Sequence, residues 1–428
     1  MSATSASHAL SANQVGARSY AGSRQLFYWA CASILWTYMS VSFSNVYKSW
    51  YIATAVVLAL TFLLLLAGAL KTRGLVRSMG LIVLYFLYLF LTAAWAAYPD
   101  VTIRYVLEET IFIAIFALFY LLSINFTPDQ IVNFFVWLVP PAILVDFVTY
   151  MTNPEALRLG FFVLVFLPFV LLFCMLRLLQ SFSVRNLCFV TACLVMLVIG
   201  VSRAPLLTAG LGLLLMFVTI TKRRKTRVRI IAGFLIVSAV ATSAILAVPA
   251  LRTNAARSIA RITYRDVTVG DQVIAAEKPD LVRWAIYSDA ISLYKTNWLF
   301  GMGYMNFMPW FGEKYSFSFE NAKGKETVGM NLHDVYQTWA LEGGLPCLAI
   351  VALILWKYFS ILRRRIRRSE NDREKAYYKL LVVGMICLLV QGLFSQVHQT
   401  PVLFVLLGIV YALNDNSKRR ATNLARVS

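Results

Sequence analysis

The chain has 428 residues, of which 60% are hydrophobic and only 14% are charged, and its formal net charge is +20. An ordinary soluble domain is about 45–50% apolar and about 25% charged, so this composition excludes a soluble globular protein and indicates a polytopic membrane protein. The six cysteines lie within or beside apolar runs and form no CxxC pattern, so neither a disulfide framework nor a cysteine metal site is expected.

Apolar runs long enough to cross roughly 30 Å of hydrocarbon occur about twelve times along the chain. Residues 1–25 are rich in Ser and Ala but have no apolar core, so we expect a cytoplasmic tail followed by an uncleaved signal anchor. The expected spans are 26–43, 50–70, 79–97, 109–124, 131–149, 158–179, 186–201, 204–221, 230–249, 335–356, 379–396 and 400–413. The sequence therefore predicts an all-α fold with nine spans in 26–249, a large segment at 250–334, three spans in 335–413 and a tail at 414–428.

The basic residues are concentrated on one side of this predicted topology. They gather between even- and odd-numbered spans or after the last span, at 71–77, 222–229, 357–379 and from Lys418 to Arg426. This is the positive-inside pattern, which places both termini in the cytoplasm and segment 250–334 on the outer side. The charge is therefore explained by topology and by contact with anionic lipid, and not by nucleic acid binding.

A charged stretch follows the outer segment, where NLHDVYQTWALEGGLP covers residues 331–346. His333 is expected at the membrane boundary, and Glu342 follows nine residues later, about 13 Å deeper along a regular helix. A carboxylate at that depth is costly without a partner or a wet environment. Alone, the pair is explained by an interfacial histidine and a structural, hydrogen-bonded glutamate.

Two arginines are expected at the same outer level. Arg203 lies in VSRAPLLTAG, where Pro205 predicts a sharp outward turn between two spans, although a lone arginine there also fits snorkelling to lipid phosphate. Arg283 lies at the head of DLVRWAIYSDAISLYKTNWLFGMGYMNF, whose spacing predicts an amphipathic helix on the outer face. Gly301 and Gly303 form the turn that closes this segment.

Together these residues predict one kind of chemistry. Guanidinium groups match phosphate oxygens bidentately and stay charged at any working pH. A histidine, with an ordinary pKa of about 6.5, accepts a proton from a sugar hydroxyl near neutrality. The combination indicates transfer of a glycan from a diphosphate leaving group to an alcohol.

In this order and spacing, the SRAPLLTAG, VRWAIYSDAISLYKTNWLFGMGYMNF and LHDVYQTWALEGGLP motifs resemble the O-antigen ligase and polymerase superfamily, over about residues 186–356. The resemblance implies a GT-C-like glycosyltransferase of the bacterial inner membrane. Its donor is a glycan linked to undecaprenyl diphosphate, its acceptor lies on the periplasmic side, and it uses no metal or other cofactor.

The resemblance also implies roles for the matching residues. His333 is the base that deprotonates the acceptor hydroxyl, Arg203 and Arg283 hold the diphosphate, and Glu342 supports the site. The family usually has asparagine after the histidine, whereas this chain has Asp334, which either raises the pKa of His333 or caps the following helix.

Three functions remain open at this point. A ligase attaches finished polysaccharide to lipid A-core, a polymerase extends a lipid-linked repeat, and a transporter carries its substrate between two halves of the bundle. The compact outer segment and the single histidine-centred motif favour the ligase. Of the other histidines, His398 in SQVHQTP has at most a supporting role, and His8 in the N-terminal tail is expected to be dispensable.

Overall fold

The computed structural model describes most of the predicted spans as helices. Two hairpins and isolated positions between 228 and 332 are also described, and the longer described ranges are 72–140, 166–199, 203–220, 281–315, 334–394 and 401–425. Several predicted spans therefore lie wholly or partly outside the described residues, namely 26–43, 50–70, most of 230–249 and the parts of two spans between 141 and 165.

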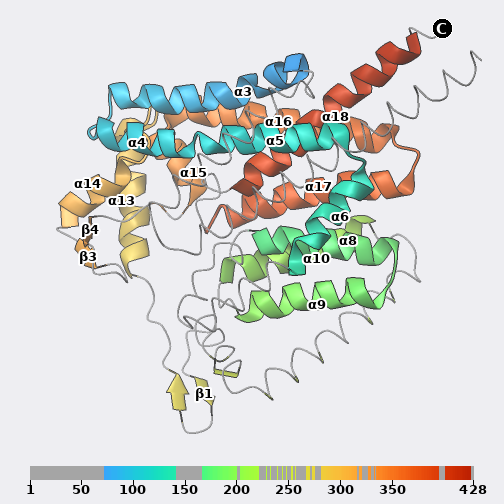
Figure 1. Cartoon of the computed structure of the whole chain (residues 1–428). Helices are drawn as coiled ribbons and strands as arrows, with labels where there is room; N and C mark the ends of the chain where they lie inside the picture. Colours follow the sequence, from blue (N-terminus) through green and yellow to red (C-terminus); the bar gives the residue numbers. More distant parts are fainter. Residues whose placement is uncertain are drawn as a thin grey trace, which may run out of the picture.

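The first half of the described chain is a succession of apolar helices, coloured blue to green in Figure 1. Pro99 and Pro128 are first residues of their helices, where proline has no hydrogen bond to lose. The elements are α3 (Thr72–Leu91), η1 (Thr92–Ala94), α4 (Pro99–Glu109), α5 (Ile111–Asn125), α6 (Pro128–Trp137), α8 (Leu167–Gln180), α9 (Val184–Ile199) and α10 (Arg203–Ile220).

The second half contains the predicted outer segment and the last helices. Its helices are α13 (Leu281–Asn297), α14 (Phe307–Tyr315), α15 (Val335–Gln337), the π-helical turn η4 (Thr338–Glu342), α16 (Gly344–Arg368), α17 (Asp372–Gln391) and α18 (Pro401–Ala425). Two antiparallel hairpins pair β1 (Val267–Val269) with β2 (Gln272–Ile274), and β3 (Ser318–Glu320) with β4 (Glu326–Val328). The protein is therefore mostly helical, as predicted, and among the described residues the two hairpins in segment 250–334 are the parts that are not helix or loop.

Among the described residues, three helical stretches are long and apolar enough to cross a membrane: Gly74–Ala94, Pro99–Ile124 and Gly344–Arg368. Four shorter apolar helices accompany them, at Leu167–Gln180, Val184–Leu197, Ala204–Ile220 and Pro401–Asp415. These helices support a membrane protein, while the count of twelve spans stays a prediction.

The helices pack around a shared core, in which α5 and α18 lie side by side and run in the same direction, since Phe112, Phe116 and Tyr120 meet Phe404, Tyr411 and Asp415 in that order. Phe112 stacks on Phe404 with ring centroids 5.0 Å apart, and Phe116 meets Tyr411 edge-to-face at 5.7 Å. Gly408 allows this approach, because a Cβ there would lie only 2.5 Å from the carbonyl oxygen of Phe116. The interlocked rings hold the two helices in one register.

One end of the bundle, which we call the basic end, collects arginines and helix caps. Arg365, Arg367 and Arg368 lie in the last turn of α16 at this end. Here the hydroxyls of Ser78 and Tyr120 donate to Asp415, and Lys379 Nζ donates to the carbonyl of Thr219 at 2.7 Å. These contacts bring the starts of α3 and α17 beside the ends of α10 and of the apolar part of α18.

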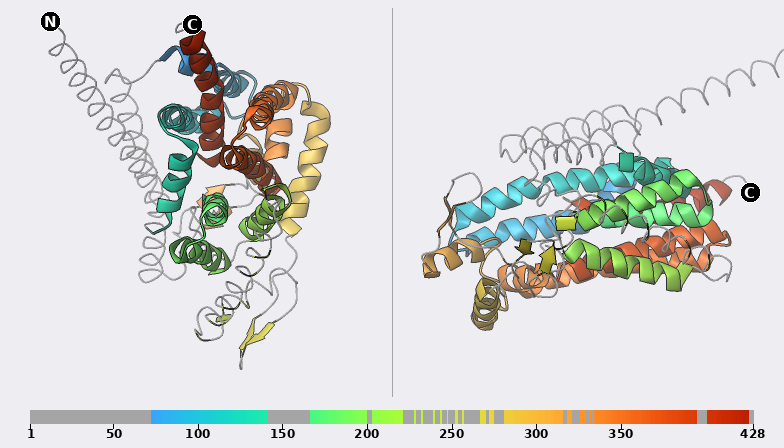
Figure 2. Two further views of the ribbon diagram at one scale, coloured as in Figure 1. Left: turned by 90° about the vertical axis from the view of Figure 1, so that its right-hand side faces the viewer. Right: turned by 90° about the horizontal axis from the view of Figure 1, so that it is seen from below.

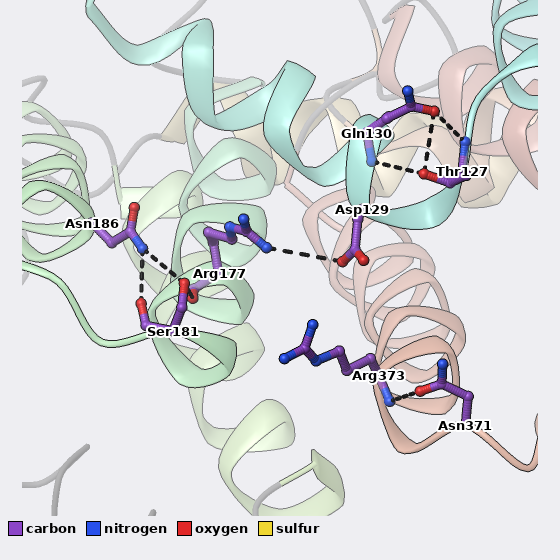
Figure 3. Close-up of polar contacts among 8 residues, drawn as sticks. All are labelled: Thr127, Asp129, Gln130, Arg177, Ser181, Asn186, Asn371 and Arg373. Carbon is purple, nitrogen blue, oxygen red and sulfur yellow. Dashed lines mark hydrogen bonds and ion pairs between the residues drawn. The ribbon is translucent and has the colours of Figure 1, made fainter.

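Short polar motifs start the helices on that side, as Figure 3 shows. Thr127 and Gln130 form a reciprocal capping box at the start of α6. Asn371 caps α17 by accepting the N–H of Arg373 at 2.9 Å. The ion pair of Asp129 with Arg177 is long, at 3.9 Å, and half exposed, so it orients α6 on α8 more than it stabilises them.

The opposite end, which we call the α13 end, carries α13, α14 and the hairpin of β3 and β4 from the predicted outer segment. Helix α13 runs across the direction of the long helices in Figure 1 and appears end-on in the right-hand view of Figure 2. One face of α13 is buried through Ile286, Asp289 and Ala290, which follow helical spacing, while Ile291 is 61% exposed. Helix α13 is therefore packed on one side across one end of the bundle, and its place on the outer face of the membrane stays a prediction.

Candidate active site at the α13 end of the bundle

The predicted site stretch begins with a helix cap. Asp334 Oδ1 accepts the N–H groups of Tyr336 at 2.7 Å and Gln337 at 3.4 Å, so its carboxylate closes the first turn of α15. Burial raises the pKa of Asp334, while the two backbone hydrogen bonds act in the opposite direction. Of the two roles predicted for Asp334, the cap is the one visible in the structure.

The helix expected from 335 to 356 is not continuous. The turn η4 is π-helical and ends at Gly343, and α16 starts at Gly344, which has φ +67°. Glu342 therefore does not follow His333 along a regular helix, and the depth of about 13 Å estimated from 1.5 Å per residue no longer applies. The pair of glycines explains the break, since a positive φ is easily adopted only by glycine.

A break in a helix frees backbone groups, and here a turn from the α13 side satisfies them. Met302 N–H donates to the carbonyl of Leu341 at 2.9 Å, and Gly303 N–H donates to that of Glu342 at 3.1 Å. At the start of α16, Leu345 N–H donates to the carbonyl of Leu299 at 3.0 Å. The glycine turn that follows α13 is thus bonded to the backbone on both sides of the break.

This contact requires glycine at both surfaces. Gly301 and Gly303 have φ +78° and +100°. A Cβ on Gly301 would overlap the carbonyl of Glu342, and a Cβ on Gly344 would lie 2.5 Å from the nitrogen of Gly301. The GMG and GG motifs are therefore the two halves of one backbone-to-backbone contact.

Glu342 joins the same assembly through its side chain. It is 2% exposed, and its Oε1 accepts the N–H of Phe307, the first residue of α14, at 3.1 Å. A carboxylate at a helix N-terminus is stabilised by the free N–H groups and by the helix dipole. Its Oε2 has no hydrogen-bond partner among the described residues. Glu342 therefore connects η4 to α14.

The proposed diphosphate-binding arginines lie in the first turns of two helices. Arg203 is the first residue of α10, whose far end meets the start of α17 through Lys379. Helices α10 and α17 are antiparallel, so Arg203 lies near the end of α17. There the carbonyl of Gly392 accepts the N–H of Val335 at 2.9 Å. Arg283 lies in the first turn of α13. The side chains of both arginines lie outside the described residues.

The predicted base, His333, is approached only through its described neighbour Leu332. His333 and His398 lie outside the described residues. Leu332, directly before His333, is 1% exposed and belongs to an apolar cluster that also contains Ile286, three residues after Arg283. The backbone that leads to His333 therefore packs in the cluster that includes the first half of α13.

Two residues of α3 and its extension were not anticipated from the sequence. Tyr88 Oη donates to the carbonyl of Gly343 at 2.7 Å, and Trp95 Nε1 donates to that of Gly301 at 3.2 Å. Both side chains sit in an apolar run that looks like any membrane span. Their partners are backbone carbonyls more than 200 residues away, so no local pattern signals them.

The sequence that forms the α13 end can now be compared with known proteins. The long apolar helices of the described residues support a helical membrane protein, and the cross-lying α13 meets the broken helix at one end of it. Residues 187–352 match the family model described as O-antigen ligase. The resemblance expected for residues 186–356 is therefore confirmed over this segment. No curated protein gives a significant match to the chain.

The matched segment contains α10, α13, both glycine motifs and Glu342. The family supports a glycosyltransferase-like enzyme, an O-antigen ligase or a related polymerase, that works on glycan and lipid-linked substrates. Among the described residues no group of three His, Cys, Asp or Glu side chains is arranged to hold a metal ion.

Proposed function

We propose that the protein is an O-antigen ligase. It transfers polysaccharide from undecaprenyl diphosphate to lipid A-core at the periplasmic face of the bacterial inner membrane. The observation that carries the proposal is the family match over 187–352, which covers the elements gathered at the α13 end of the bundle. Both termini then lie in the cytoplasm, on the side of the basic end.

The proposed reaction replaces one bond to the donor sugar with another. His333 takes the proton from an acceptor hydroxyl, and the oxygen attacks the anomeric carbon of the donor glycan. The bond from that carbon to the diphosphate oxygen breaks, and undecaprenyl diphosphate leaves with the bonding electron pair. Arg203 and Arg283 stabilise the charge on the leaving group, so the proposed mechanism needs neither a metal nor another cofactor.

Glu342 and Asp334 have positioning roles in this scheme. The carboxylate of Glu342 accepts a backbone N–H of α14, which precedes His333 in the chain. The carboxylate of Asp334 accepts backbone N–H groups of α15, the helix that follows His333. Rigid support of this kind matters, because a base must stay within hydrogen-bond reach of the proton that it abstracts.

Deletion of the gene tests the proposal in cells. A ligase leaves lipid A-core without polysaccharide, and lipid-linked polymer accumulates. Core that carries a single repeat would instead identify a polymerase, and unchanged surface polysaccharide would contradict both. Restored surface polysaccharide from a plasmid copy is the control for effects on neighbouring genes.

A further inference from the structure

Glu109, the last residue of α4, is a buried carboxylate with no part in the proposed chemistry. It is 6% exposed, and the hydroxyl of Tyr304 donates to its Oε1 at 2.6 Å. Tyr304 is 1% exposed. A short hydrogen bond to a carboxylate in a dry surrounding is among the stronger polar contacts available to a protein.

The same stretch of chain holds Tyr304 by its backbone. The N–H of Tyr304 donates to Thr92 Oγ1 at 3.0 Å, and its carbonyl accepts from Thr102 Oγ1 at 2.8 Å. Asn306 adds a third connection, since its Nδ2 donates to Thr102 at 2.7 Å and its Oδ1 accepts the N–H of Tyr98 at 2.7 Å. Residues 92–109 thus hold Tyr304 and Asn306 from one side.

Between these two residues the backbone is strained. Met305 has φ +61°, a left-handed conformation that a side chain with a Cβ rarely adopts. Such a conformation is unfavourable and persists only where neighbouring contacts impose it. The contacts of Tyr304 and Asn306 impose it here, and they turn the chain so that Phe307 N–H reaches Glu342.

The other side of this turn is the glycine contact with η4. Met302 and Gly303 bond to Leu341 and Glu342 directly before Tyr304. A shift of Tyr304 therefore moves the groups that fix η4, and with them the stretch that begins at Asp334.

We propose that Glu109 is a positioning residue for the transferase site and that it acts through Tyr304. The kinetic test of this inference rests on the proposed function. The claim that Glu109 fixes the glycine turn through Tyr304 does not depend on that function. Glu109 sets where the glycine turn lies, and the turn sets where η4 lies relative to α13. Neither residue touches substrate in this account.

Tyr304→Phe is the main test, because it removes one hydroxyl and keeps the ring that fills the core. With purified protein in detergent, kcat should fall on the order of tenfold, since the hydrogen bond that fixes Tyr304 to Glu109 is lost. KM for the lipid-linked donor should stay unchanged, because the arginines are untouched. Glu109→Gln, which keeps an acceptor for the hydroxyl, should lose much less than Glu109→Leu. The matched control is Glu108→Leu, one residue earlier, where the carboxylate pairs with the exposed Arg104 at 3.0 Å.

A double variant tests whether Glu109 and Tyr304 act through the same contact. The double variant Glu109→Leu with Tyr304→Phe should have the same kcat as the less active of the two single variants, since both changes remove the same hydrogen bond. Multiplied losses, or a wild-type kcat for Tyr304→Phe at normal abundance, would overturn the inference.

Hydrogen exchange gives a second test that needs no activity. Amides of Met302 and Gly303 should exchange faster in Tyr304→Phe and not in Glu108→Leu. If the wild-type protein transfers no glycan, the proposed function fails while this comparison still decides the role of Glu109. Equal exchange in wild type and Tyr304→Phe would overturn the positioning role.

Discussion

At the scale of single residues, the charged and glycine-rich stretch after His333 is explained by backbone contacts. Asp334 caps α15, Glu342 caps α14, and Gly344 lets α16 start against Gly301. The sequence indicated that these residues were unusual, because a buried glutamate beside two glycines is rare in an apolar helix. It did not indicate the helix break, since the partner backbone lies some 40 residues earlier in the chain.

Gly344→Ala should reduce the amount of folded protein. Alanine at φ +67° costs about 1–2 kcal/mol, and its Cβ would lie 2.5 Å from Gly301 nitrogen, where only backbone movement makes room. The control is Gly210→Ala in α10, where no atom lies within 4 Å of the added Cβ. Thermal unfolding in detergent should show a clear drop in Tm for the first variant and none for the second. Equal Tm values would show that the close contact is not needed.

Glu342→Ala and Glu342→Gln should differ. Alanine leaves the buried N–H of Phe307 without its acceptor, which costs about 1–3 kcal/mol, so protein level and activity should fall together. Glutamine keeps an acceptor oxygen and should keep the protein level. Membrane abundance and specific activity, measured side by side, check this. A normal level of Glu342→Ala protein with full activity would remove Glu342 from the site.

At the scale of elements, apolar runs predicted helices well but not their ends. The span expected at 109–124 is part of a longer helical stretch, Pro99–Ile124. The sequence did not predict its first part, α4, because Asp100, Arg104 and two glutamates lower the hydropathy there. In the structure Glu109 is paired with Tyr304, a partner 195 residues away that no local pattern reveals. Arg104 and Glu108 pair with each other on the same helix.

Helices α13 and α14 illustrate the other limit. Their apolar spacing predicted one amphipathic helix and a turn, whereas their mutual docking depends on a pair that spacing does not show. Lys314 Nζ donates to Asp289 Oδ1 at 2.6 Å. The hydrogen bond to Asp289 raises the pKa of Lys314, so the contact is intact at neutral pH and is lost only as the pH rises through that raised value.

Helix α13 should lie at the level of the lipid headgroups. A spin label at Ile291, on the exposed face of α13, should report a depth between two references in a bilayer. These are a label at Leu353, on an exposed face of α16, and one at Glu313 in α14. The ratio of accessibility to oxygen and to a water-soluble nickel complex measures the depth. A value at Ile291 equal to that at Glu313 would place α13 in water and contradict the prediction.

At the scale of the whole molecule, the arginines in the last turn of α16 and helix α13 lie at opposite ends of the bundle (Figure 1). That separation agrees with the side assignment made from charge alone, because lysines and arginines remain on the cytoplasmic side. The membrane side of each segment stays a prediction. The sequence could not predict how Tyr88, Trp95 and Glu109 hold the turn, since such contacts depend on packing between distant helices.

Reporter fusions test this orientation. A reporter inserted near Arg365 should be active only as a cytoplasmic fusion, and one within 310–325 only as a periplasmic fusion. The two positions control for each other in the same chain. A reversed result would move the site away from lipid A-core and exclude the proposed reaction.

The central claim is transfer from a lipid diphosphate by His333 acting as the base. The most direct measurement is glycan transfer by purified protein in detergent with EDTA, using undecaprenyl diphosphate-linked polysaccharide and lipid A-core. Wild-type protein should remain active, His333→Ala should lose about 10²–10⁴ in rate, and Arg283→Lys should restore little of the activity lost in Arg283→Ala, because lysine lacks the bidentate fork. His8→Ala is the control histidine and should transfer at the wild-type rate. Full activity of His333→Ala, or complete loss of wild-type activity on adding EDTA, would contradict the mechanism.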